Sequence, residues 1–323
     1  MRAVVFEGAG GNEVVHVRER PDPIPQGTEV VVAVRYAGLN PADVLQRGGR
    51  YPAPPGAPTD VPGLEVAGEV VVTGDRVRRW RPGDRVFGLV GGGGLASRVL
   101  VDESHLAAVP DDLDDAEAAA VPEAFITAHD ALRTQAALAP GERVLVHGAT
   151  GGVGTAALQI VAASGARAFG VTRSAAGRDL VASLGASPVD DADFVEQVTE
   201  ATAGAGVDVV LELVGAPHFP GNLQVLATGA RIVVVGVGAG SKVELPLVAL
   251  MGKRARIVGT VLRARSTVEK AVAVRAFERE LVPGLATGRL HALVDATYPL
   301  DAVTDAFDHL EAAGKKGKIL LAF

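Results

Sequence analysis

The chain has 323 residues and 48% apolar side chains, so it is long enough for two domains with sizeable cores. Its net charge of −7 argues against nucleic acid or an anionic membrane as a main partner, because both require a concentrated basic surface. The absence of cysteine excludes disulfides and thiolate zinc sites, and the lack of a signal peptide or membrane-length apolar run predicts a cytoplasmic protein.

Valine-rich runs broken by Gly and Pro fill the first 110 residues and predict a mostly antiparallel, barrel-like unit. The segment between the third and fourth runs, 47–63, is too rich in Pro and Gly for regular structure and is either functional or disordered. The predicted strands cover residues 2–6, 13–19, 28–36, 65–73, 84–89 and 97–102.

The pattern changes near residue 111, where an acidic start leads into a helical run. Short β-branched strands then alternate with helical segments, which predicts right-handed βαβ crossovers and a doubly wound parallel sheet. These strands cover residues 143–147, 167–172, 207–213, 231–237 and 256–262, and strand and helix resume at 292–322.

The stretch RVLVHGATGGVGTAALQ (143–159) carries the most informative local signal. On the pattern G-x-G-x-x-G it places Ala149, Gly151 and Gly154, with Gly152 in the gap. Gly151 and Gly152 allow the backbone to approach a pyrophosphate, and Gly154 allows the helix to pack close to the strand. An ordinary βα loop is the alternative, but the flanking strand, helix and further βα units favour a dinucleotide.

The end of the second strand favours NADPH over NADH. An NAD enzyme would place Asp or Glu about 20 residues beyond the glycines, to accept from the ribose 2′-hydroxyl. Here Thr172 is followed by Arg173 and Ser174, and then by Arg178 on the next helix. Arg173 can pair with a 2′-phosphate and Ser174 can donate to it, although a solvent-exposed arginine is the alternative.

Other catalytic families lack their signatures in this sequence. No tyrosine is followed by lysine at Tyr-x-x-x-Lys spacing, and there is neither a G-x-x-x-x-G-K-[ST] loop nor a G-x-S-x-G elbow. No two histidines have i,i+4 metal spacing, so we predict no metal site and assign no histidine a role.

Along nearly its whole length the sequence resembles the medium-chain dehydrogenase/reductase superfamily, within its zinc-free quinone oxidoreductase (zeta-crystallin-like) branch. The resemblance implies an α/β protein with a GroES-like β-barrel catalytic domain (1–122 and 262–323) and a Rossmann NADPH-binding domain (123–261). The matching segments are GLNPADVLQRGGRYPAPPGA (38–57), PGLEVAG (62–68), AAAVPEAFITAHDAL (118–132), GATGGVGTAALQ (148–159), TVLRAR (260–265) and GKKGKILL (314–321).

Zinc-dependent relatives have Cys where Gly38 stands and His where Leu64 stands. The resemblance therefore implies zinc-independent hydride transfer from NADPH to a quinone bound in the cleft between the domains. It places Asn40, Asp43 and Tyr51 in the catalytic pocket. Asn40 could donate to a developing oxyanion, Tyr51 could stack on the ring or donate its hydroxyl, and Leu64 could add an apolar wall.

These residues also have structural interpretations. Asn40 can equally cap a helix beginning at Pro41, and Asp43 is better explained as a first-turn acid of that helix than as a proton donor. Tyr51 has no evident core role, so function is favoured there. Glu65 is expected to have a structural hydrogen-bonding role.

The resemblance further implies a set of cofactor contacts, although valines at 214 and 235 could be plain core. These are Thr127, Gly152, Val153, Arg173, Ser174, Arg178, Val214, Gly215, Val235, Gly236, Leu262 and Lys318.

Two other functions stay open. Reduction of an activated C=C bond in an enone, alkenal or enoyl thioester would use the same scaffold, with Tyr51 as the candidate acid. A non-catalytic NADPH-binding sensor or RNA-binding protein is the alternative from another class. We expect a homodimer paired through the edge strand 256–262, with a tetramer as the alternative.

Overall fold

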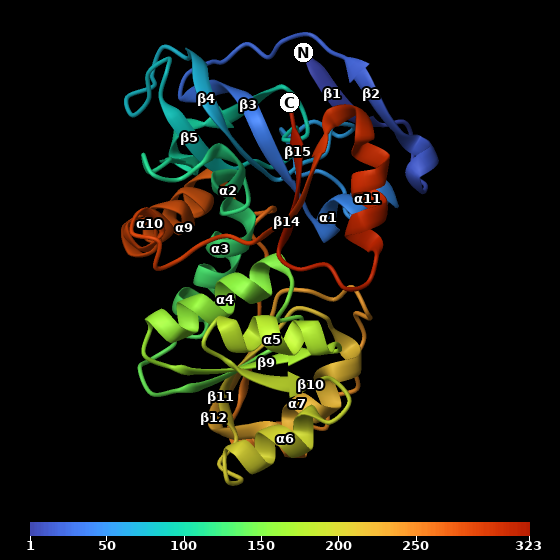
Figure 1. Cartoon of the computed structure of the whole chain (residues 1–323), viewed down its shortest axis with the longest axis vertical. Coiled ribbons are helices and arrows are strands. Elements are labelled where there is room, and N and C mark those ends of the chain that lie inside the picture. Colours follow the sequence, from blue (N-terminus) through green and yellow to red (C-terminus); the bar gives the residue numbers. More distant parts are fainter. The chain divides into compact units, whose positions relative to one another are not determined.

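The computed structural model describes residues 1–323, which divide into two compact units (Figure 1). Unit 1 comprises Met1–Ile126 and Leu262–Phe323, and unit 2 comprises Thr127–Val261. The first division lies inside helix α3 (Pro122–His129), between Ile126 and Thr127, whereas the sequence predicts it between residues 122 and 123. No helix combines the length and the apolar character needed to cross a membrane.

A seven-stranded sheet forms the body of unit 1. Its strands follow the order β14–β15–β3–β4–β5–β7, and β6 also pairs with β3. β14 and β15 run parallel and the other neighbours antiparallel, as the valine-rich pattern predicts. The strands are β3 (Glu29–Leu39), β4 (Glu65–Thr73), β5 (Arg85–Leu89), β6 (Arg98–Asp102), β7 (Leu106–Ala108), β14 (Val294–Pro299) and β15 (Lys318–Ala322); β1 (Arg2–Phe6) and β2 (Val15–Glu19) form a separate antiparallel pair.

The helices of unit 1 begin where sequence signals favour a helix start. α1 and α3 both begin at a proline, whose fixed φ suits the first helical position, and α9 begins with a capping box made by Ser266 and Glu269. The Pro- and Gly-rich segment after α1 contains no helix or strand, as expected. The helices are α1 (Pro41–Arg47), α2 (Asp115–Ala119), α3, α9 (Thr267–Glu280), α10 (Val282–Ala286) and α11 (Val303–Glu311).

Unit 2 is a doubly wound α/β domain, which confirms the predicted fold class. Its six strands follow the order β10–β9–β8–β11–β12–β13, and every neighbouring pair is parallel. α4 and α5 cover one face of the sheet, and α6 and α7 cover the other (Figure 1). The strands are β8 (Arg143–Val146), β9 (Arg167–Thr172), β10 (Ser187–Asp190), β11 (Val207–Glu212), β12 (Leu226–Val234) and β13 (Arg256–Gly259). The helices are α4 (Gly152–Ala163), α5 (Ala175–Ser183), α6 (Phe194–Ala201), α7 (Phe219–Val225) and α8 (Leu247–Lys253), and a π-helical segment (Asp130–Gln135) follows α3.

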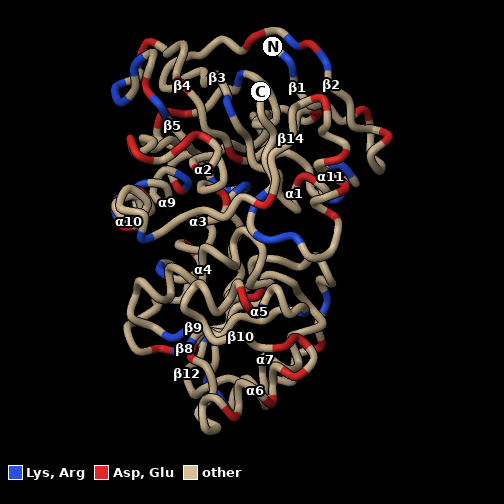
Figure 2. The backbone as a smooth tube through the Cα atoms, viewed as in Figure 1, with Lys and Arg blue, Asp and Glu red and all other residues tan.

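Two predicted strands of unit 2 end earlier than expected. β12 and β13 were predicted to reach residues 237 and 262, but their last paired residues are Val234 and Gly259. Beyond β12 the N–H groups of Val235 and Gly236 share one acceptor, the backbone oxygen of Glu212 at the end of β11, and beyond β13 the Thr260 N–H donates to the Val234 oxygen. Acidic and basic residues are interspersed along both units (Figure 2).

Candidate active site

The predicted phosphate loop joins β8 to α4, as the glycine pattern requires. Gly151 precedes the first residue of α4, and a Cβ added to it would have only the Gly148 oxygen nearby, at 3.6 Å. At Gly154 an added Cβ would lie 2.3 Å from the Gly148 oxygen, so α4 packs directly on the loop. The loop therefore leaves room for a pyrophosphate at the helix N-terminus. Val153 and Gly152 are partly exposed in the first turn of α4.

The three residues predicted to bind a 2′-phosphate have different surroundings. Arg173 is exposed at the end of β9 and makes no hydrogen bond or ion pair. Ser174 caps α5, its hydroxyl oxygen accepting from the Gly177 N–H at 3.1 Å, and its proton stays available to donate. Arg178 forms an ion pair with Asp190. Arg173 is thus the cation among them that has no protein partner.

Glu212, which the sequence did not single out, connects the ends of β11 and β12. One oxygen of its fully buried carboxylate accepts from the N–H groups of Val214 and Gly215, both at 2.8 Å. Its backbone oxygen accepts from Val235 at 2.9 Å and from Gly236 at 3.1 Å. Four residues predicted to contact the cofactor are therefore fixed by one acidic residue. Both valines among them are partly exposed, which disfavours the plain-core interpretation.

Two histidines to which we assigned no role meet beside Glu212. The rings of His147 and His218 stack at 4.1 Å, and their nitrogens and the Glu212 carboxylate lie within 4.8 Å of one another. Asn222 links this cluster, donating to Glu212 at 2.8 Å and lying 2.6 Å from His147 Nε2. Imidazole and carboxylate can bind divalent metals. Here, however, both Glu212 oxygens already accept hydrogen bonds. The His147 and His218 rings are stacked, so their nitrogen lone pairs do not point to one position, and the three residues do not form a metal site.

The Glu212 surroundings also shift proton affinities. Burial raises the pKa of Glu212, but the imidazoles of His218 and His147 and the two backbone donors outweigh burial and hold it below its usual value. Burial lowers the pKa of His147, so this ring stays neutral. The network keeps Glu212 ionised as an acceptor for the turn that follows β11.

In unit 1, a buried cluster joins Asn40, Glu65 and Lys318. The Lys318 ammonium lies 2.6 Å from Glu65 Oε1 and donates to Asn40 Oδ1 at 2.5 Å and to the Leu39 oxygen at 2.9 Å. The Asn40 amide in turn donates to Glu65 Oε1 at 2.9 Å and to the Gly38 oxygen at 3.2 Å. All three N–H donors of Lys318 and both amide donors of Asn40 are therefore engaged within the protein, which satisfies the expected hydrogen-bonding role of Glu65.

Asp43 ties helix α1 to the loop that precedes β4. Its two carboxylate oxygens accept from the N–H groups of Asn40, at 2.8 Å, and Gly63, at 3.0 Å. Burial raises its pKa to about 6, against the two hydrogen bonds and the charges of Lys318 and Arg263. Because Asp43 has no exposed surface, its geometry matches the first-turn acid better than a proton donor.

Tyr51 lies on the long loop and is held by Arg263. The guanidinium lies 5.0 Å from the Tyr51 ring centroid and donates to its backbone oxygen at 3.3 Å and to Gly91 at 2.9 Å. Burial and the charge of Glu123 raise the pKa of the Tyr51 hydroxyl, which has no hydrogen-bond partner in the protein. Leu64 and Leu262, by contrast, are core residues with 2% and 7% exposure, so Leu64 presents little surface as a pocket wall. Thr127, in α3, is also buried.

The cluster does not offer the donors of a zinc site. Gly38 and Leu64 supply no ligand, and a Cβ at Gly38 would lie 2.2 Å from Glu65 Oε1. Glu65 is instead ion-paired with the Lys318 ammonium. A tetrahedral zinc site with nitrogen or sulfur donors does not fit these residues.

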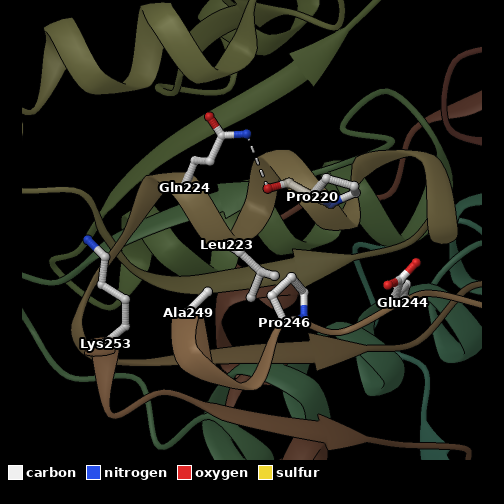
Figure 3. A pocket seen from close by; sticks show the side chains of 7 residues that line it. All are labelled: Pro220, Leu223, Gln224, Glu244, Pro246, Ala249 and Lys253. Atoms are coloured by element: carbon white, nitrogen blue, oxygen red, sulfur yellow. Dashed lines mark hydrogen bonds between the residues drawn. The ribbon is translucent and has the colours of Figure 1, made fainter. Parts of the chain in front are cut away.

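A separate pocket of about 490 Å³ opens between α7 and α8 in unit 2 (Figure 3). Leu223, Pro246 and Ala249 form its apolar centre, and Glu244 and Lys253 lie on opposite sides. None of the predicted site residues lines it, so we do not assign the reaction to this pocket.

Comparisons with known proteins identify the family. Residues 26–111 match the alcohol dehydrogenase GroES-like domain, and residues 152–276 match the zinc-binding dehydrogenase family. Quinone oxidoreductase from Homo sapiens is 33% identical over 328 residues, covering 99% of this chain and 97% of that protein. The chain is therefore an oxidoreductase of the medium-chain dehydrogenase/reductase superfamily and belongs to its quinone oxidoreductase branch.

Solved structures agree with this assignment. Mycobacterial Rv1454c, solved with NADPH, superposes with a TM-score of 0.90 at 26% identity, covering 100% of both chains. The CurK enoyl reductase superposes with a TM-score of 0.88 at 29% identity, covering 99% of this chain and 98% of that one. The family and these neighbours indicate a nicotinamide cofactor.

Proposed function

We propose that the protein is an NADPH-dependent, zinc-independent quinone oxidoreductase. The observation that carries the proposal is the polar cluster of unit 1. In a chain similar to human quinone oxidoreductase over 99% of its length, Gly38 and Leu64 supply no metal ligand and the Lys318 ammonium is ion-paired with Glu65. The preference for NADPH is supported by Arg173, an exposed cation without a protein partner at the end of β9.

Unit 2 provides the binding groups for the cofactor. NADPH, when bound, supplies a hydride to the acceptor. The N-terminus of α4, which begins at Gly152, and the open backbone at Gly151 would hold the pyrophosphate, and Arg173 would form a charge-assisted pair with the 2′-phosphate. Glu212 keeps the turns after β11 and β12 in one arrangement, so the backbone that faces the cofactor is preorganised.

Unit 1 provides the acceptor site. A quinone carbonyl is electron-poor and its product regains aromaticity, so reduction requires positioning and exclusion of water more than Lewis-acid activation. The Tyr51 ring, backed by Arg263, offers a flat surface for stacking. Asn40 orients the cluster rather than donating to the acceptor, since both of its amide donors are engaged.

Reduction of an activated C=C bond is the second candidate, favoured by the likeness to the CurK enoyl reductase. Such a reaction requires an acid that protonates the carbon next to the carbonyl group. The two candidates share the hydride donor and differ in the acceptor.

The test is a comparison of acceptors. NADPH oxidation is followed with an ortho-quinone, a simple enone and an alkenal, with NADH in parallel. We expect the largest kcat/KM with the quinone and NADPH. A preference for the enone or alkenal would assign C=C reduction instead, and tight NADPH binding without turnover would favour a non-catalytic sensor.

We also propose a homodimer through β13. This strand is the last of the parallel sheet and has one unpaired edge. Helix α8, which precedes it, exposes large apolar side chains, with Leu247 63%, Val248 82% and Met251 73% exposed. An exposed apolar patch beside an open strand edge is typical of a subunit interface.

A further inference from the structure

Glu123 is an acid within the family-matching segment 118–132 to which the resemblance assigns no role. It is the second residue of α3, and its backbone N–H donates to Glu65 Oε2 at 2.7 Å. This bond attaches the start of α3 to the cluster of Asn40, Glu65 and Lys318. The Glu123 carboxyl group itself makes no hydrogen bond or ion pair in the structure, and the residue is partly exposed.

Charged side chains from several parts of unit 1 interact electrostatically with Glu123. Glu65 on β4, Asp43 on α1, Lys318 on β15 and Arg263 all act on its carboxyl group. The charge of Glu123 in turn acts on the Tyr51 hydroxyl and on the Lys270 ammonium of α9. Glu123 therefore lies among the residues to which we assign acceptor binding.

The proton affinity of Glu123 suits transfer at neutral pH. Burial, followed by the negative charge of Glu65, raises its pKa to about 8, although Lys318 and Arg263 oppose this. At pH 7 the carboxyl group is thus mostly protonated. Two other acids that interact with Glu123 are less suitable. Asp43 has no exposed surface and both its oxygens accept backbone hydrogen bonds, and the pKa of the Tyr51 hydroxyl is raised above its ordinary value of 10.

We propose that Glu123 is the proton donor of the reduction, an inference that rests on the proposed function. The acceptor gains two electrons and one hydrogen as a hydride and becomes an anion. The O–H bond of Glu123 then breaks and a new O–H bond forms on the anionic oxygen of the hydroquinone, or a C–H bond on the α-carbon of a reduced enone. Water returns a proton to the Glu123 carboxylate, so the net reaction consumes one proton from solvent.

The experiment compares kcat for NADPH oxidation by phenanthrenequinone between pH 5.5 and 9.5 in the wild type and in Glu123→Gln. We expect the wild-type kcat to fall as the pH rises through about 8, because the donor loses its proton. Glu123→Gln should lose this pH dependence and be slower at pH 7 by at least about tenfold, less than the roughly 10²- to 10⁴-fold typical of a positioned acid because a quinone is easily reduced. Its Kd for NADPH should stay within about twofold of wild type, because unit 2 holds the cofactor-binding groups.

Glu117→Gln is the matched control. Glu117 is another partly buried glutamate of unit 1 whose pKa is raised by burial, but its carboxylate accepts from the Ala292 N–H, outside the cluster. This variant should keep the wild-type rate and pH profile.

The outcomes separate the two claims. Glu123→Gln with wild-type kcat and an unchanged pH profile overturns the proton-donor assignment and leaves the proposed function intact. A wild type that binds NADPH but reduces no quinone at any pH overturns both. If the Gln variant does not fold, Glu123→Asp decides. A change in the pH at which kcat falls supports the assignment, and a fall of kcat at the wild-type pH contradicts it.

Discussion

Replacing Gly154 by alanine tests whether close packing of α4 on the phosphate loop creates the cofactor site. A Cβ at this position would lie 2.3 Å from the Gly148 oxygen, 2.7 Å from Ala149 Cα and 2.8 Å from the Ala149 carbonyl carbon. These distances are about 1 Å shorter than ordinary van der Waals contacts. The obstructing atoms are all backbone, so a side-chain rotation cannot relieve the contact and the helix has to move.

The expected cost follows from two opposing effects. Overpacking of this kind costs about 1–3 kcal/mol, while alanine in a helix gains about 1 kcal/mol over glycine. We expect the unyielding backbone contact to outweigh the gain, leaving a net loss of about 1–2 kcal/mol and, for a chain of 323 residues, a Tm lower by roughly 1.5–3 °C. Displacement of α4 also withdraws hydrogen bonds from the pyrophosphate, and losing one such bond to a charged group should raise the Kd for NADPH about tenfold or more.

Thermal unfolding and NADPH titration measure these effects, with Gly252→Ala as the control. Gly252 lies inside α8 with nothing within 4 Å of an added Cβ, so alanine should stabilise the protein by about 0.5–1 kcal/mol and leave NADPH affinity unchanged. If Gly154→Ala matched the wild type in both Tm and Kd, our explanation of the glycine at this position would be wrong.

The remaining predictions concern the cofactor, the buried cluster and the dimer. Arg173→Glu should weaken NADPH binding by roughly 10- to 100-fold and spare NADH, since it removes one charge-assisted hydrogen-bonding partner; equal effects on both cofactors would remove Arg173 from the 2′-phosphate site. Lys318→Met should cost about 3–5 kcal/mol in urea unfolding because it leaves the Glu65 carboxylate, which has 0% exposure, without its cation; wild-type stability would refute the buried ion pair. Met251→Asp should convert a dimer into a monomer in analytical ultracentrifugation at micromolar concentration, and an unchanged dimer would place the interface elsewhere.

The parts of the fold that follow from local pattern could be predicted. β8 and β9 are short, apolar and flanked by glycine turns, and the sequence places them within a residue of their observed bounds. β10 was missed because Pro188 removes a ladder donor, and proline is tolerated there since β10 is an edge strand. β12 begins at Leu226, earlier than predicted, because a register shift accommodates the turn-like segment around Gly229.

The site was harder to predict because it depends on contacts distant in sequence. Nothing local indicates that Lys318 pairs with Glu65 and Asn40, which lie more than 250 residues away. A signal for Glu123 was present: it is the only charged residue in the apolar stretch AAAVPEAFI, directly after a proline that starts a helix. His147 and His218 follow neighbouring parallel strands, whose carboxyl ends meet at one edge, so their proximity could also have been inferred.

The most direct test of the account is the rate of NADPH oxidation by an ortho-quinone before and after exhaustive chelation, with the metal content of the protein measured alongside. We predict the same kcat and kcat/KM in both samples, because Gly38 and Leu64 supply no zinc ligand and Lys318 neutralises Glu65. Loss of activity on chelation, restored by added Zn²⁺, would contradict the account.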